Sequence, residues 1–181
     1  MTQDAMSAPT RRAMPLWFWI VAGLGLAWNV FGAVQFTGSL SATAESLQAQ
    51  GLTADQAAVM LGYPVWMTIA FAVGVFGGAL GCVLLLARRA IAVPVFALSL
   101  AGYLALYAGD ILHGVFAAMG APQVVVLTVV VAIAAGLWAL ARSFRARGLL
   151  SCHLPLAGPP IGKRRAGFGR AFRIDGGRLR I

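Results

Sequence analysis

Long apolar segments that alternate with short polar ones are the main feature of the chain. The clearest segment runs from residue 64 to residue 87, carries no charged side chain and ends on Arg88 and Arg89. At about 1.5 Å per residue, a helix of this length reaches about 36 Å, enough to cross a hydrocarbon core of about 30 Å. The same pattern predicts helices over about residues 15–36, 91–109 and 123–141. We therefore expect an all-α fold, a bundle of four transmembrane helices.

The composition indicates an integral membrane protein with a single membrane domain. The 181 residues are 60% hydrophobic and 10% charged, with a mean hydropathy of +0.84, whereas soluble domains carry about 25% charged residues. The membrane domain is expected over residues 15–146. Neither residues 1–14 nor residues 147–181 show apolar periodicity, so they are expected to form a disordered N-terminus and a disordered basic tail.

The positions of the positive charges predict the orientation in the membrane. All fourteen Lys and Arg lie at residues 11–12, at residues 88–89 or from residue 142 onward. Because basic residues stay on the cytoplasmic side of a membrane, this pattern predicts an even number of crossings with both termini in the cytoplasm. Residues 37–63 then form a periplasmic loop, in which Thr53 to Gln56 (TADQ) matches the capping box of a short amphipathic helix.

The first apolar segment has a second interpretation, as a signal peptide cleaved after Ala42 to Ala44. A signal peptide has an apolar core of about 7 to 15 residues. The segment at residues 15–36 is longer than this, which favours a retained membrane helix.

Two helix faces are expected to pack closely against other helices. Small residues let helix backbones approach one another in a membrane, and a polar amide adds a hydrogen bond between helices. On the first helix this face includes Asn29, for which simple packing is the favoured role and that hydrogen bond the alternative. The two faces together comprise Gly25, Asn29, Gly32, Gly74, Gly77, Gly78 and Gly81.

The third helix carries the best candidate for chemistry, a polar stripe that spans about 120° of its circumference. Asp110 and His113 lie three residues apart in this stripe, close enough to share a hydrogen bond or a proton. The functional interpretation is an outward-facing polar pocket; the structural one is capping of the helix end. We favour capping, because Asp110 lies about 31 Å from Arg89, at the outer interface where water hydrates a carboxylate. The candidate pocket comprises Gln35, Tyr63, Tyr103, Tyr107, Asp110 and His113.

The sequence offers little to support an enzyme. No nucleophile accompanies a base and an orienting group, and no metal-binding motif or phosphate-binding loop is present, so neither a cofactor nor a metal is expected. The basic tail mixes arginines with Phe168 and Phe172, which is compatible with single-stranded nucleic acid. Contact with anionic lipids is the simpler interpretation, since it needs only charge at the membrane surface.

Four stretches resemble a family of small bacterial inner-membrane proteins. They are Leu26–Gln35 (LAWNVFGAVQ), Tyr63–Trp66, the glycine-rich region at 74–81 and Arg142–Leu149 (RSFRARGL). The resemblance covers about residues 15–149 and implies a four-helix protein of the inner membrane. Members are sometimes labelled as sugar transporters, but the family supplies no catalytic or binding residues to carry over. The chain after about Leu150 departs from the family pattern.

These observations lead to two function classes. The favoured one is a structural or accessory membrane protein whose molecular activity is undefined. The alternative is a small transporter or transporter subunit, for a sugar or another small solute, with a polar pocket at the periplasmic end. Either would act as a homo-oligomer or within a larger membrane complex.

Overall fold

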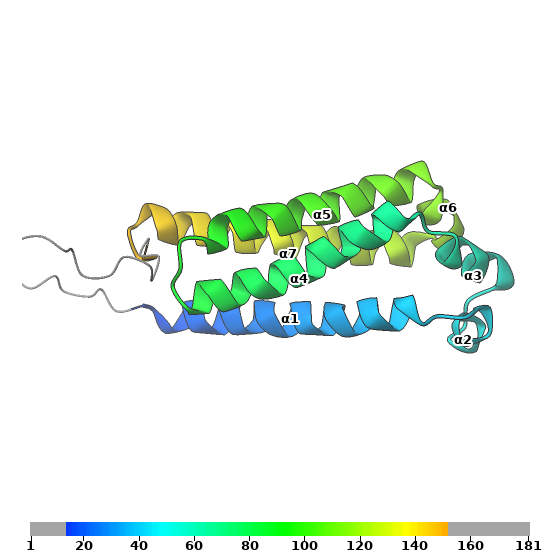
Figure 1. Ribbon diagram of the computed structural model, residues 1–181, viewed down its shortest axis with the longest axis horizontal. Helices are drawn as coiled ribbons and strands as arrows, with labels where there is room; N and C mark the ends of the chain where they lie inside the picture. Colours follow the sequence, from blue (N-terminus) through cyan, green and yellow to red (C-terminus); the bar gives the residue numbers. More distant parts are fainter. Residues whose placement is uncertain (1–13, 152–181) are drawn as a thin grey trace, which may run out of the picture.

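A computed structural model describes residues 14–151, and within that range every regular element is an α-helix. Four long helices lie side by side (Figure 1), and each is long and apolar enough to cross a membrane. The predicted all-α bundle of four membrane helices is therefore confirmed. The long helices are α1 (Leu16–Leu40), α4 (Val65–Leu86), α5 (Ala92–Leu112) and α7 (Ala121–Ala146); the short ones are α2 (Ala44–Ala49), α3 (Ala54–Leu61) and α6 (Val115–Met119).

Helices α1 and α7 extend further than their hydropathy predicted. Polar residues continue α1 to Leu40 because the Thr37 and Ser39 hydroxyls donate to the Val34 and Phe36 carbonyls, at 2.8 and 2.7 Å. Helix α7 begins before Gln123 because Pro122 stands in its first turn, where its missing N–H costs nothing.

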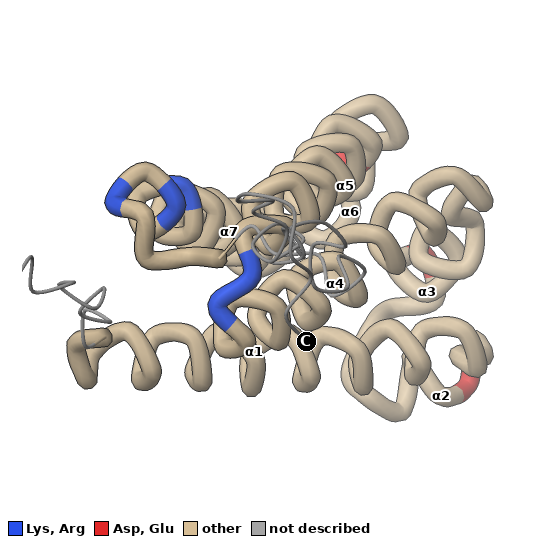
Figure 2. The backbone as a smooth tube through the Cα atoms, turned by 60° about the vertical axis from the view of Figure 1, so that its left-hand side comes forward, with Lys and Arg blue, Asp and Glu red and all other residues tan. Residues whose placement is uncertain are grey.

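The bundle has a loop end, where α2, α3 and α6 lie, and a basic end, where α4 turns into α5 and α7 finishes (Figures 1 and 2). At the loop end, Thr53 Oγ1 accepts from Gln56 N at 3.3 Å and Gln56 Oε1 accepts from Thr53 N at 3.1 Å, so the predicted capping box is present. Gln56 Nε2 also donates to the Ala118 carbonyl at 3.1 Å, which joins α3 to α6. Helix α6 was not predicted.

Helix α4 is the central helix of the bundle. It packs most extensively on α5 and then on α1, while α7 packs on α5. Helices α1 and α7 barely touch. Of the most apolar stretch of each helix, 39% is buried in α4 and in α5, against 22% in α1 and in α7. Contacts between neighbouring helices therefore follow the order α1, α4, α5, α7, while all four helices contribute to one core.

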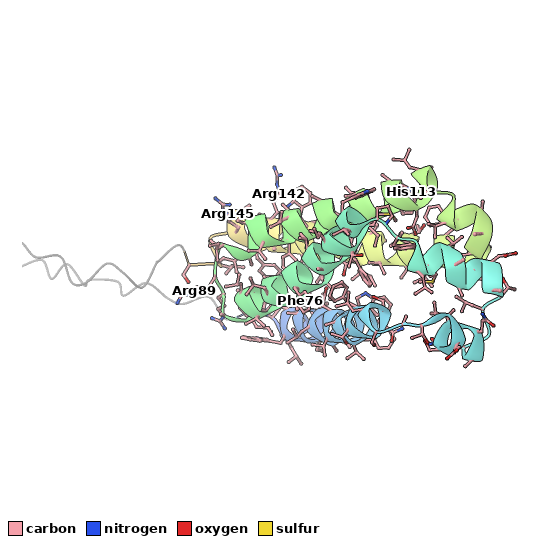
Figure 3. All side chains as sticks on the ribbon, turned by 45° about the vertical axis from the view of Figure 1, so that its right-hand side comes forward. Phe76, Arg89, His113, Arg142 and Arg145 are labelled. Carbon is pink, nitrogen blue, oxygen red and sulfur yellow. The ribbon has the colours of Figure 1, made fainter. Side chains whose placement is uncertain are left out.

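At the basic end, α1 and α7 meet through aromatic rings. Phe144 stacks on Phe18 with ring centroids 4.8 Å apart and on Trp17 at 5.4 Å. Arg142 and Arg145 project from α7 near this contact (Figure 3), and the Arg142 guanidinium covers Trp138 at 5.5 Å. The bundle is thus closed across α1 and α7 at the basic end.

The turn between α4 and α5 is built by Arg88 and completed by the chain that follows α7. Arg88 has a left-handed backbone, with φ of 55°, and its N–H donates to the Leu85 carbonyl at 2.9 Å. The N–H of Arg89 donates to the Leu84 carbonyl at 2.8 Å, which gives the paired bonds of a Schellman cap. Ser151 N–H donates to the Arg88 carbonyl at 2.8 Å, and the Ser151 carbonyl accepts from the Ala90 N–H at 3.2 Å.

Candidate functional site

The glycines of α4 lie where α5 crosses it most closely. A methyl group on Gly74 would stand 2.7 Å from Tyr103 Cε1, and one on Gly81 would stand 2.7 Å from Phe96 Cδ1. Gly77 faces Ser99, whose Cβ would be 3.2 Å away. Real Cβ atoms do not approach other atoms to 2.7 Å, so glycine is what lets the two helices pack at this distance.

Gly78 faces α1 instead, and its neighbour is the Asn29 carboxamide. Asn29 Oδ1 occupies the space that a Cβ of residue 78 would need. The Nδ2 of Asn29 donates to the Gly25 carbonyl of its own helix, at 2.8 Å. Asn29 therefore packs against Gly78, and the hydrogen bond that its amide donates stays within α1 and does not reach another helix. Gly32 lies further along α1, where a Cβ would be 3.4 Å from Val75 Cγ2.

Gly25 and Gly102 make further close contacts. A Cβ on Gly25 would lie 3.0 Å from Leu137 Cδ2 of α7. A Cβ on Gly102 would lie 2.8 Å from the Ala70 carbonyl oxygen and 2.9 Å from the Gly74 nitrogen, so here backbone faces backbone. Sequence reasoning missed Gly102. Its spacing of seven residues from Gly109, which places both on one face of α5, is the signal that would have found it.

Asp110 is the centre of a polar cluster at the loop end. Its side chain is 1% exposed, and each of its two oxygens accepts a hydrogen bond from a different part of the chain. The Tyr63 hydroxyl donates to Oδ1 at 3.4 Å, and Gln123 Nε2 donates to Oδ2 at 3.0 Å. The cluster of Tyr63, Asp110 and Gln123 therefore ties the start of α4, the end of α5 and the start of α7 together.

One expectation about Asp110 is corrected by this arrangement. The carboxylate does not face water at the outer interface, because α6 turns the chain back and brings Gln123 over the end of α5. Gln123 was not predicted as its partner. No local spacing signals that pairing, which depends on the short turn through α6.

Tyr63 is held in its neutral, proton-donating form. Burial raises the pKa of the Tyr63 phenol well above its usual range, and the charge of the neighbouring Asp110 raises it further. At neutral pH the hydroxyl therefore keeps its proton and serves as the donor to Asp110.

The other predicted pocket residues do not join this cluster. Gln35 is exposed on α1 and has no hydrogen bond within residues 14–151. His113 is exposed at the loop end, where its ring lies 6.0 Å from Trp66 rather than against Asp110 (Figure 3). Tyr107 packs edge-on against Phe116 at 5.1 Å. Tyr103 is buried in the middle of the bundle, over Gly74. The six-residue polar pocket is therefore not assembled as predicted.

Ser99 is also part of the helix interface. It is 1% exposed, and its hydroxyl donates to the Gly74 carbonyl at 2.6 Å.

Within residues 14–151 no group of three His, Cys, Asp or Glu side chains lies close enough to hold a metal ion.

The fold defines a class, that of helical multi-pass membrane proteins. No family model, curated protein or solved structure matches the chain. The resemblance to small bacterial inner-membrane proteins therefore stays a prediction.

Proposed function

We propose that this chain is a structural or accessory protein of the bacterial inner membrane. The proposal rests on the hydrogen bonding of the buried carboxylate of Asp110. Both oxygens of Asp110 accept hydrogen bonds from the protein itself, at 3.4 Å from Tyr63 and 3.0 Å from Gln123. Ser99 is likewise bonded to the Gly74 carbonyl. Polar groups that satisfy one another between helices stabilise a bundle and leave few to bind a polar solute.

We propose that the basic end faces the cytoplasm and the loop end faces the periplasm. Arg88, Arg89, Arg142 and Arg145 gather at the basic end, while Glu45 and Asp55 lie on α2 and α3 (Figure 2). This distribution supports the orientation because basic residues are retained in the cytoplasm. The proposed anionic-lipid contact of the tail belongs to the same side, although residues 152–181 lie outside the described range.

Cysteine labelling tests the orientation. Ser41→Cys and Ser151→Cys are made separately in a Cys152→Ser background, and intact cells are treated with a membrane-impermeant maleimide. Cys82 is buried and serves as an internal negative control. We expect labelling at position 41 and, only after the membrane is opened, at position 151. Labelling of both positions from outside would reject an even number of crossings.

The alternative function is a small transporter for a sugar or another small solute. Reconstituted protein in proteoliposomes separates the two classes. An accessory protein gives no saturable uptake from a panel of radiolabelled sugars and co-purifies in mild detergent with a stoichiometric partner or with further copies of itself. Saturable uptake that Asp110→Asn abolishes, with the protein still folded, would replace the accessory proposal by the transporter.

A further inference from the structure

An open apolar groove lies between α1 and α7. Its volume is about 770 Å³, within the range of about 300 to 1,000 Å³ that small-molecule sites occupy. It exists because α1 and α7 touch mainly at the basic end, through Phe144, and diverge beyond it. Its walls are Val21, Leu24, Trp28, Phe31, Ile133 and Leu137. Several of these side chains are exposed, Leu24 by 66% and Phe31 by 57%, so the groove opens sideways toward lipid.

The groove adjoins a small void in the middle of the bundle, lined mainly by apolar side chains. Trp28, Ile133 and Leu137 line both spaces. The void also touches Asn29 and Tyr103, each only 4% exposed. Its volume of about 10 Å³ is room for one oxygen atom.

Two polar atoms at this void have no hydrogen-bond partner within residues 14–151: the Tyr103 hydroxyl and Asn29 Oδ1. In the same part of the chain, every fully enclosed side-chain nitrogen or oxygen has a partner. These two atoms are therefore not enclosed but border open space, and the void is the space that both residues share. Asn29 Oδ1 can accept a hydrogen bond, and the Tyr103 hydroxyl can donate or accept one.

The void lies near the middle of the membrane. Tyr103 is about 16 Å along α5 from its first residue and about 14 Å from its last. The headgroup of a phospholipid does not reach this depth, since the hydrocarbon core is about 30 Å thick. An occupant that satisfies both polar atoms and also fills the groove must therefore carry its oxygen on an apolar body that dissolves in the bilayer.

We propose that the groove and the void together bind a lipid-soluble alcohol with a long apolar chain. Its hydroxyl donates to Asn29 Oδ1 and accepts from the Tyr103 hydroxyl, while its chain lies in the groove between α1 and α7. In an apolar environment these hydrogen bonds stabilise the bound alcohol, because a hydroxyl left unpaired in hydrocarbon is costly in free energy. The site is independent of the accessory role proposed above.

Photolabelling in lipid nanodiscs tests the site in the full chain. The probe is a 16-carbon alcohol that carries a diazirine and an alkyne, and the comparison probe is the same chain without the hydroxyl. Gly136→Leu fills the groove, whereas Gly23→Leu is the matched control. A Cβ atom added at either glycine meets nothing within 4 Å, but only Gly136 lines the groove. We expect Gly136→Leu to lower labelling by both probes at least about fivefold, while Gly23→Leu leaves it unchanged.

Tyr103→Phe tests the hydrogen bond, because it keeps the ring over Gly74 and removes only the hydroxyl. Loss of one hydrogen bond predicts a weakening of about two- to tenfold for the alcohol and none for the hydrocarbon probe. Equal labelling by the two probes in the natural protein, unaffected by Tyr103→Phe, would mean that the groove holds acyl chains and that the void holds water. Equal loss in Gly23→Leu and Gly136→Leu, or no labelling at all, would reject the groove as a site.

Discussion

The contact between Asn29 and Gly78 shows how a single atom limits what one position tolerates. Asn29 Oδ1 stands where any larger residue at position 78 would place its Cβ. The carboxamide is held there by its bond to the Gly25 carbonyl, at 2.8 Å, so it has little freedom to move aside. The neighbouring Gly102 faces backbone atoms of α4, which have less freedom still.

Gly78→Ala is expected to destabilise the bundle by about 1–3 kcal/mol, the usual cost of overpacking, as measured by thermal unfolding in detergent. In an Asn29→Ala background the same substitution should cost clearly less, because the obstructing oxygen is gone. Gly102→Ala should cost the same in both backgrounds. Val125→Leu, at a side chain that is 59% exposed, should change stability by less than about 0.5 kcal/mol. Additive effects of Gly78→Ala and Asn29→Ala would contradict the contact.

Asp110→Asn tests whether the polar cluster is structural. Asparagine keeps the shape, and its oxygen can still accept from Gln123 while its Nδ2 faces the Tyr63 hydroxyl, which can turn to accept, but the contacts lose the negative charge that strengthens them. We expect a loss of about 1–3 kcal/mol in the free energy of unfolding, more than an exposed helix-end charge would give. Tyr63→Phe removes one donor and should cost less. An unchanged unfolding temperature in Asp110→Asn would show that the cluster does not hold α4, α5 and α7 together.

At the scale of the helices, the sequence predicted which long helices exist better than it predicted where they end and which residues they contact. Hydropathy located all four long helices because charges interrupt the apolar segments only at their ends. It missed the end of α1 because Thr37 and Ser39 satisfy their hydroxyls on the helix itself. It missed α6 because five residues between two glycines carry no readable period. Because α6 was not predicted, the position of Gln123 beside Asp110 could not be predicted either.

Gln56 allows two roles of one side chain to be separated. Its Oε1 completes the capping box of α3, and its Nε2 donates to the Ala118 carbonyl of α6. Gln56→Glu keeps the capping acceptor but removes the donor. Hydrogen exchange should therefore speed up at α6 while α3 stays protected, whereas Gln56→Ala should speed up exchange at both. Unchanged exchange at α6 in Gln56→Glu would mean that α3 does not secure it.

At the scale of the whole molecule, helix contacts follow the order α1, α4, α5, α7, and the stability of the bundle depends most on α4. Helix α1 depends on α4 through Gly78 and Asn29, and α7 depends on α5, so the two outer helices are held separately. They meet through the aromatic contact of Phe18 and Trp17 with Phe144 and through Gly25, which lies against Leu137. This division leaves the α1–α7 groove available without weakening the central pair.

The junction between Ser151 and Arg88 gives a prediction at the same scale. Ser151→Pro removes the N–H that bonds to the Arg88 carbonyl at 2.8 Å, whereas Ser151→Ala removes only the hydroxyl. We expect the proline variant to lower the unfolding temperature and to expose the α4–α5 turn to protease, while the alanine variant stays close to the natural protein. Equal protease resistance of the two variants would show that the junction contributes nothing.

The same junction has a consequence for biosynthesis. The turn between α4 and α5 leaves the ribosome early, but its Arg88 carbonyl finds its partner only when Ser151 has been made. Between those two moments α5, α6 and α7 must all be translated and the last two spans inserted. The hairpin of α4 and α5 therefore waits in the bilayer with its turn unfinished until Ser151 has left the ribosome.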